Sequence, residues 1–249
     1  GVHSGVAGGI VASSFRILRQ LLSRLENPET GQMTPAFLIE PIPDVRRAEA
    51  AQAGAVLAEE FNTMFPYAGG SGPLSDDPTE LVLCNTWLAS LEITGMAGIP
   101  DLDNAGNVLR PYTTAKFGLR LPPTTDVAKV AEQLTTLLTA DPPGKVAVSL
   151  KIDTLATGWH APVTEPYLEE SLRAASQEFF GAPAVSIGCG GSIPFMQFLA
   201  DTVPQAQFVV TGVLGPHSNA HGPNEFLHLP TAIKLTASMA KVIFDWGQR

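Results

Sequence analysis

Two histidines stand four positions apart in the segment GPHSNAHGPNEFL, residues 215–227. Neutral imidazole is a good ligand for zinc and related ions, so His217 and His221 are the first candidates for a metal site. Glycine and proline stand on both sides of the pair, and the segment therefore cannot form the regular helix that an HxxxH pair needs. We interpret His217 as a loop residue near the pocket, and the spacing alone leaves the role of His221 open.

The other reactive side chains give weaker evidence of a catalytic or metal site. Cys84 and Cys189 are far apart and form no CxxC motif, which argues against a thiolate zinc site and a disulfide scaffold and favours buried free thiols. The segment GCGGS around Cys189 is not the GxSxG elbow of a nucleophile. The glutamate pairs at 59–60 and 169–170 lie in charged amphipathic helices, so we interpret them as solvated faces rather than as a general base.

Composition limits the class of protein. The chain has 249 residues, of which 45% are hydrophobic, enough for one large domain or two modest ones. Its net charge of -9 argues against nucleic acid as a partner, because binding to phosphates depends on lysine and arginine. No apolar run reaches the roughly 18 residues of a membrane helix. We expect no membrane partner and a cytoplasmic location, although the start GVHSGVAGGIV leaves a lost targeting segment open.

The elements that position these residues fall into two blocks. In the first, residues 1–155, alternation of Phe117, Leu119 and Leu121 with polar positions predicts a strand that carries Arg120 on its polar face. The order of the elements is that of a split βαβ unit, which predicts a ferredoxin-like βαββαβ layer with an insertion at 26–80. The predicted strands are 81–95, 115–123 and 145–152, and the predicted helices are 11–25, 45–61 and 124–138.

The second block, residues 156–249, has α/β character. A helix over 165–181 begins at Pro166 and is followed by Gly181, the usual asymmetry of helix ends. This block has too few strands to cover its own helices, so it is typical of part of a larger domain. The remaining predicted elements are strands at 182–188 and 206–214 and helices at 192–203 and 230–246.

Four motifs resemble a known family. VHSGVAGG, GNVLRPYTTAKFGLRLPP, GCGGSIP and AHGPNE occur in an order and spacing similar to the M20 family of dinuclear zinc metallopeptidases, which includes dipeptidases, carboxypeptidases, desuccinylases and related amidohydrolases. The match covers nearly the whole chain but only roughly the C-terminal half of a usual member. The resemblance implies a lid or dimerisation domain at 1–155, followed by the end of an α/β catalytic domain at 156–249.

The resemblance also assigns roles in the lid. His3 matches a histidine that reaches across the homodimer into the partner's active site and stabilises the oxyanion. Asn107 matches a position that helps to hold the substrate. Arg120 matches the arginine that binds the terminal carboxylate, a task for which the planar guanidinium is suited and the lysine ammonium is not.

In the catalytic part, the resemblance implies that Gly191 and Ser192 contact the same carboxylate and that His221 is the last metal ligand, with Glu225 beside it. The implied cofactor is a pair of divalent ions, with zinc expected and manganese or cobalt left open. The implied reaction is hydrolysis of the amide bond of dipeptides or N-acyl amino acids that carry a free carboxylate.

The other ligands of the family, a His-x-Asp motif, further acidic ligands and a Glu-Glu pair, would stand upstream of the motif VHSG. We therefore expect the chain alone to be inactive and to need an N-terminal catalytic segment as a partner, whether it is a fragment, a processed product or half of a split enzyme. The alternative is a noncatalytic dimerisation or interaction module without a metal site. His160 and His228 receive no role from the sequence.

Overall fold

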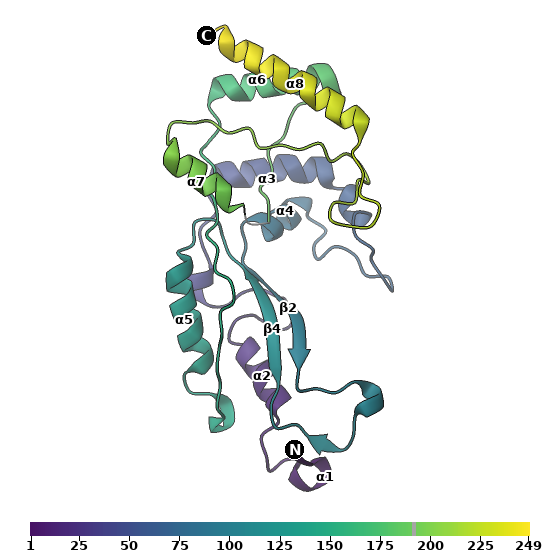
Figure 1. Cartoon of the computed structure of the whole chain (residues 1–249), viewed down its shortest axis with the longest axis vertical. Helices are drawn as coiled ribbons and strands as arrows, with labels where there is room; N and C mark the ends of the chain where they lie inside the picture. Colours follow the sequence, from purple (N-terminus) through teal and green to yellow (C-terminus); the bar gives the residue numbers. More distant parts are fainter. Residues whose placement is uncertain (191–192) are drawn as a thin grey trace. The chain divides into compact units, whose positions relative to one another are not determined.

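The computed structural model describes residues 1–190 and 193–249 (Figure 1). The chain divides into two compact units, and each is described by itself. The first unit comprises residues 1–43, 83–159 and 189–194, and the second comprises 44–82, 160–188 and 195–249.

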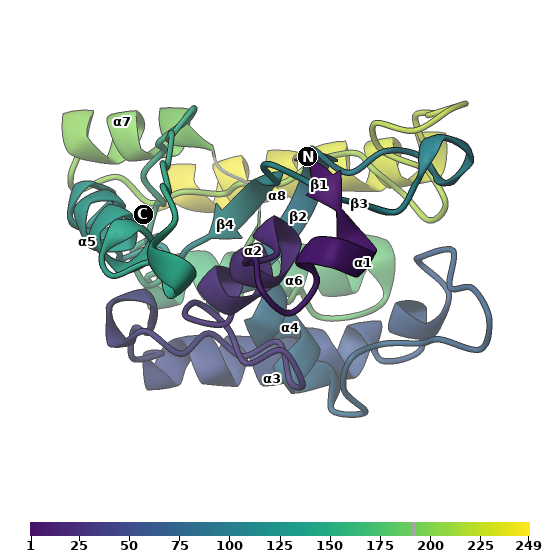
Figure 2. The same cartoon turned by 90° about the horizontal axis from the view of Figure 1, so that it is seen from below.

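Two short antiparallel sheets organise the first unit. Strand β2 (Ser90–Ala97) pairs with β4 (Thr114–Arg120), and the register places Leu91 opposite Leu119. Strand β1 (Val2–His3) pairs with β3 (Val108–Leu109). Figure 2 shows β1 beside β3, with the short helix α1 (Ser4–Ala7) directly after β1. The predicted strand at 115–123 is confirmed, and Arg120 is exposed as its alternation requires.

Two amphipathic helices build the core of this unit with the sheet. Helix α2 (Ser14–Leu22) begins at the N-cap Ser13, and α5 (Val127–Thr139) begins at Asp126, whose carboxylate accepts from two backbone amides of the first turn. Arg24 donates to the carbonyl oxygens of Leu137 and Ala140 at 2.7 and 2.8 Å, which pairs acceptors that the end of α5 leaves open. The buried cluster comprises Ile17, Leu21, Leu25, Met33, Leu38, Leu91, Val130, Leu134 and Leu138.

The strand predicted over 81–95 is partly wrong. Helix α4 (Pro78–Thr86) occupies its first part, and β2 begins only at Ser90. Asp77 explains the helix: its carboxylate accepts from the amide of Thr79 at 2.8 Å, and Pro78 suits the first helical position. The apolar residues Val82 and Leu83 are both buried and adjacent, so they do not alternate as in a strand.

Residues 145–152 do not form the predicted strand. Val146, Val148 and Leu150 pack against the core while the intervening residues are exposed, so the alternation is correct. However, no sheet ladder in the described part of the chain includes this segment, and a 3-10 turn (Pro143–Lys145) precedes it. The structure is therefore a mixed α/β fold with small antiparallel sheets, and it does not show the ferredoxin-like topology.

Helices dominate the second unit. Helix α3 (Asp44–Leu57) lies in the predicted insertion, and α7 (Pro194–Thr202) follows the glycine-rich motif. Helix α6 (Pro166–Phe180) ends at Gly181, whose φ of 81° is left-handed as the sequence predicts for a helix end. It packs beside α8 (Leu229–Gly247), where Ser171 donates to Asp245 at 2.6 Å (Figure 1). The remaining 3-10 turns are Ala36–Leu38, Glu60–Asn62 and Leu102–Asn104.

Two other predictions are wrong. The segments 182–188 and 206–214 are not strands in the described structure, because neither belongs to a ladder and an extended segment needs a hydrogen-bonded neighbour to become one. Cys84 and Cys189 are exposed rather than buried, on α4 and in the segment before α7. Among the described residues, no helix is both long and apolar enough to cross a bilayer.

Candidate functional site

His3 and Asn107 come together at one end of the first unit. His3 pairs with Val108 in the β1–β3 ladder, and the amide of Ser4 donates to the Asn107 carbonyl at 2.9 Å. The Nδ1 atom of His3 accepts from the amide of Gly5 at 3.1 Å. In the neutral ring this bond places the proton on Nε2, which makes Nε2–H the donor of the exposed imidazole.

Arg120 lies at the other end of β4. It is the last residue of the strand, opposite Ser90, whereas Thr114 at the first end lies opposite Ala97. Arg110, which follows β3, donates to the Gly98 carbonyl at 3.0 Å and so holds the β1–β3 ladder near that first end. A seven-residue strand spans about 20 Å. The structure therefore does not bring the guanidinium to His3 within this unit.

Gly191 and Ser192 lie outside the described residues. The residue before them, Gly190, meets Asn85: a Cβ atom on Gly190 would lie 2.5 Å from the backbone oxygen of Asn85 and 3.0 Å from its Oδ1. Only glycine allows so close an approach. The glycine-rich motif thus begins against the last turn of α4, a contact that the sequence could not predict across 105 positions.

His221 lies in the second unit, in an irregular loop between residues 215 and 228. Its φ is 61°, and His217 has a φ of 62°, which confirms that the segment is not a helix. The amide of His221 donates to the carboxylate of Glu225 at 3.2 Å. Both side chains are exposed. The predicted neighbours are therefore in contact, and the imidazole of His221 faces solvent.

The described residues do not make up a complete metal centre. Among residues 1–190 and 193–249, no group of three or more histidine, cysteine, aspartate or glutamate side chains could hold a metal ion. Zinc sites use three or four protein ligands. His221 offers an imidazole, and the carboxylate of Glu225 is already bonded to the His221 backbone. These residues fit a metal ion only if other ligands complete the shell.

Sequence reasoning missed a polar cluster around His160. Arg46, on α3, donates from Nε to Nε2 of His160 at 3.4 Å, binds both oxygens of Glu49 and also donates to the Ala161 carbonyl. Burial first, and the charge of Arg46 second, lower the pKa of His160. The spacing of Arg46 and Glu49 predicts a helical ion pair, but no signal links either residue to a histidine 114 positions away.

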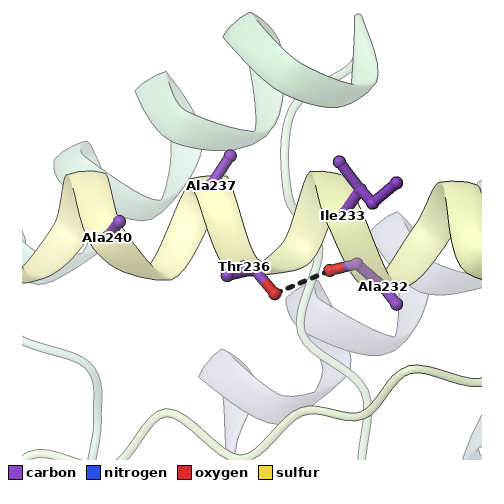
Figure 3. A pocket seen from close by; sticks show the side chains of 5 residues that line it. All are labelled: Ala232, Ile233, Thr236, Ala237 and Ala240. Atoms are coloured by element: carbon purple, nitrogen blue, oxygen red, sulfur yellow. Dashed lines mark hydrogen bonds between the residues drawn. The ribbon is translucent and has the colours of Figure 1, made fainter.

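A hollow of about 420 Å³ on α8 is apolar and carries no titratable side chain (Figure 3). The hydroxyl of Thr236 donates to the Ala232 carbonyl of its own helix at 2.8 Å, so this polar group is already engaged. The hollow therefore offers neither a base nor a ligand. Its lining residues are Ala232, Ile233, Thr236, Ala237 and Ala240.

Comparison with known proteins identifies relatives. Residues 1–146 match the M20 family described as "Peptidase dimerisation domain". The cysteinylglycine-S-conjugate dipeptidase of Corynebacterium striatum is 29% identical over 186 residues, which cover 71% of this chain and 38% of the relative.

Solved structures share the fold. The di-peptidase Dug1p from Saccharomyces cerevisiae is 20% identical with a TM-score of 0.69, and the alignment covers 100% of this chain and 52% of Dug1p. The M20 family metallo-carboxypeptidase Sso-CP2 from Sulfolobus solfataricus is 17% identical with a TM-score of 0.74, over 97% of this chain and 54% of that one. The chain thus spans about half the length of these structures.

Proposed function

The chain belongs to the M20 peptidase family through its dimerisation domain, and on that premise we propose that it is part of a dinuclear metal-dependent hydrolase. The proposed reaction is cleavage of the amide bond in dipeptides or N-acyl amino acids with a free carboxylate. The match of residues 1–146 carries the proposal. The names of the relatives, a dipeptidase and a metallo-carboxypeptidase, support the substrate class.

In the proposed mechanism, His221 would hold one metal ion through its imidazole. The pair of ions, when bound, supplies an activated water and stabilises charge on the tetrahedral oxygen. Glu225 fixes the backbone of His221 through the bond of 3.2 Å and so orients the ligand. The remaining ligands come from a segment outside this chain. Zinc is the expected metal, since imidazole and carboxylate ligands suit it.

The substrate is held from several elements. Arg120 binds the terminal carboxylate with two parallel hydrogen bonds, and Gly191 and Ser192 contact the same group. Asn107 holds the substrate from the lid. His3 of the partner subunit donates a hydrogen bond to the oxyanion, a role for which the Nε2–H of the neutral ring is suited because Nδ1 is occupied by the Gly5 amide.

The proposed division places the lid at 1–155 and the end of the catalytic domain at 156–249. Dimerisation through the lid is the function after which the matching family is named. We propose a ferredoxin-like layer for the lid, in which residues 145–152 run as an extended segment without a ladder. The alternating contacts of Val146, Val148 and Leu150 with the core support this arrangement.

A noncatalytic dimerisation module is the second candidate. The observation in its favour is that the described residues include no group of three side chains that could hold a metal ion. The two candidates differ in what an upstream segment restores. A module would dimerise with or without that segment and never bind metal, whereas the hydrolase would gain metal and activity together.

The test uses a polypeptide that joins this chain to the segment encoded upstream of Gly1. It is stripped with a chelator, supplied with zinc and assayed on dipeptides and N-acyl amino acids. We expect activity that depends on added zinc, and no activity from the 249-residue chain alone. If the joined polypeptide hydrolyses neither class of substrate, the hydrolase assignment is wrong.

A further inference from the structure

We infer that His228 is a positioning residue that holds the loop carrying His221 in place through a contact with Gly215. This inference rests on the proposed function of His221 as a metal ligand. The sequence gives His228 no role. The structure places it at the C-terminal end of the loop and Gly215 at the N-terminal end, so that one contact joins the two ends.

The first set of contacts fixes His228 to α8. His228 is the N-cap of the helix, and its Nδ1 accepts from the amide of Thr231 at 3.3 Å. The same nitrogen lies 2.7 Å from the Thr231 hydroxyl. A residue bonded in this way to the first turn of a 19-residue helix has a fixed ring orientation. His228 is thus an anchor from which the loop can be held.

The second contact joins this anchor to Gly215. A Cβ atom on Gly215 would lie 2.4 Å from both Cβ and Cγ of His228 and 2.5 Å from Nδ1. The Cβ atom of His228 does not move when the side chain rotates, so a change of rotamer cannot relieve the overlap at 2.4 Å. The backbone of Gly215 therefore rests directly against His228, and only glycine permits this approach.

Hydrogen bonds carry the constraint from Gly215 into the loop. The amide of Gly215 donates to the Ser218 hydroxyl at 3.0 Å, and the amide of Ser218 returns a bond of 3.2 Å to the Gly215 carbonyl. Ser218 is only 3% exposed, so these bonds are shielded from water. The amide of Phe226 then donates to the Ser218 carbonyl at 3.2 Å, and this hydrogen bond closes the loop over residues 218–226.

His221 lies within this closed loop, and its backbone amide donates a hydrogen bond to the carboxylate of Glu225. His228, Gly215 and Ser218 therefore restrict the backbone of the proposed ligand before any metal arrives. Groups that hydrogen-bond directly to a metal ligand typically change metal affinity ten- to a hundredfold when they are removed, and we expect the lower end of this range for His228, which acts through the loop. His228 contributes to the site through the loop and does not touch the ion.

The test combines Gly215→Ala, His228→Gly and the double variant. Glycine is one of the residues that an N-cap tolerates, and it removes the atoms that a new Cβ at 215 would meet. Gly212→Ala is the matched control, because a Cβ on Gly212 meets nothing within 4 Å. Two quantities are measured: hydrogen exchange of the Phe226 amide in the full chain, and zinc affinity of the joined polypeptide by competition with a chelator.

We expect Gly215→Ala to accelerate exchange and to lower zinc affinity at least tenfold in the wild-type background, but less than twofold in the His228→Gly background. His228→Gly alone should also lower zinc affinity about tenfold. Equal effects of Gly215→Ala in both backgrounds, or wild-type zinc affinity in His228→Gly, would overturn the inference. If the wild-type joined polypeptide binds no zinc, the proposed function fails, and the exchange rates still decide whether His228 holds the loop.

Discussion

His3 and Asn107 are joined through the backbone: the amide of Ser4, next to His3, donates to the Asn107 carbonyl at 2.9 Å. More than a hundred positions separate the two residues in the chain, yet the β1–β3 ladder holds them in one short ribbon. The two residues are therefore held as one group within the first unit.

The proposed action of His3 on the partner's site predicts complementation in mixed dimers. One subunit of the joined polypeptide carries His3→Ala and the other carries His221→Ala. The site that keeps its own His221 receives His3 from the partner, so the mixture should retain about one working site per dimer. Activity is measured on dimers isolated with two different tags. An inactive mixed dimer would contradict action in trans. The homodimers of the two variants serve as controls.

The proposed role of Arg120 predicts a loss of activity confined to substrates with a free carboxylate. Arg120→Lys keeps the charge but removes the planar guanidinium. The value of kcat/KM on a free dipeptide should therefore fall by an amount that corresponds to a loss of about 2–4 kcal/mol of transition-state stabilisation. The same dipeptide with an amidated end should be affected little. Arg173→Lys, an exposed change on α6, is the matched control. Equal losses on both substrates would count against the assigned contact.

The core of the first unit predicts a stability difference between two leucines. Leu25 is 0% exposed within the cluster of α2, α5 and the sheet, whereas Leu74 is 98% exposed. Leu25→Ala should lower the free energy of unfolding by about 2–5 kcal/mol, because it removes buried methyl groups and leaves a cavity. Leu74→Ala should change it by no more than about 0.5 kcal/mol. Denaturant titration of the full chain measures both, and similar values for the two variants would refute the described core.

His160 predicts a pH dependence of stability. Burial and the charge of Arg46 lower its pKa in the folded chain below the ordinary value of 6.5, so the unfolded chain binds a proton that the folded chain does not. The contribution of His160 to the free energy of unfolding is constant above pH 6.5. The stability falls as the pH drops from 6.5 toward the lowered pKa. His160→Gln should flatten this part of the curve, and His217→Gln, a change of an exposed histidine outside the cluster, should keep it. A curve unchanged by His160→Gln would contradict the cause.

Helix positions were predictable because their signals are local. Asp126 caps α5 and Gly181 ends α6. The buried residues of α2 are Ile17 and Leu21, whereas Phe15, which the apolar spacing would place on the buried face, is 44% exposed. The strands were harder to predict, because alternation indicates which face of a segment is buried but not whether a hydrogen-bonded neighbouring strand exists. Residues 145–152 have the alternation without a ladder, and the start of the strand predicted from 81 is instead a helix fixed by Asp77.

For the site, the sequence identified residue types, and the structure added their neighbours. The contact between His221 and Glu225 spans four positions and could be anticipated. The contacts of Gly190 with Asn85, Arg46 with His160 and Gly215 with His228 depend on the path of the chain, and no local pattern encodes them.

The metal content of the joined polypeptide tests the central claim most directly. After dialysis against zinc at low concentration, elemental analysis should find about two ions per chain in the wild type and in a His217→Ala control, and fewer in His221→Ala. A wild type without bound metal, or a His221→Ala variant with the same content as the wild type, would contradict the assignment of His221 as a ligand of a two-ion centre.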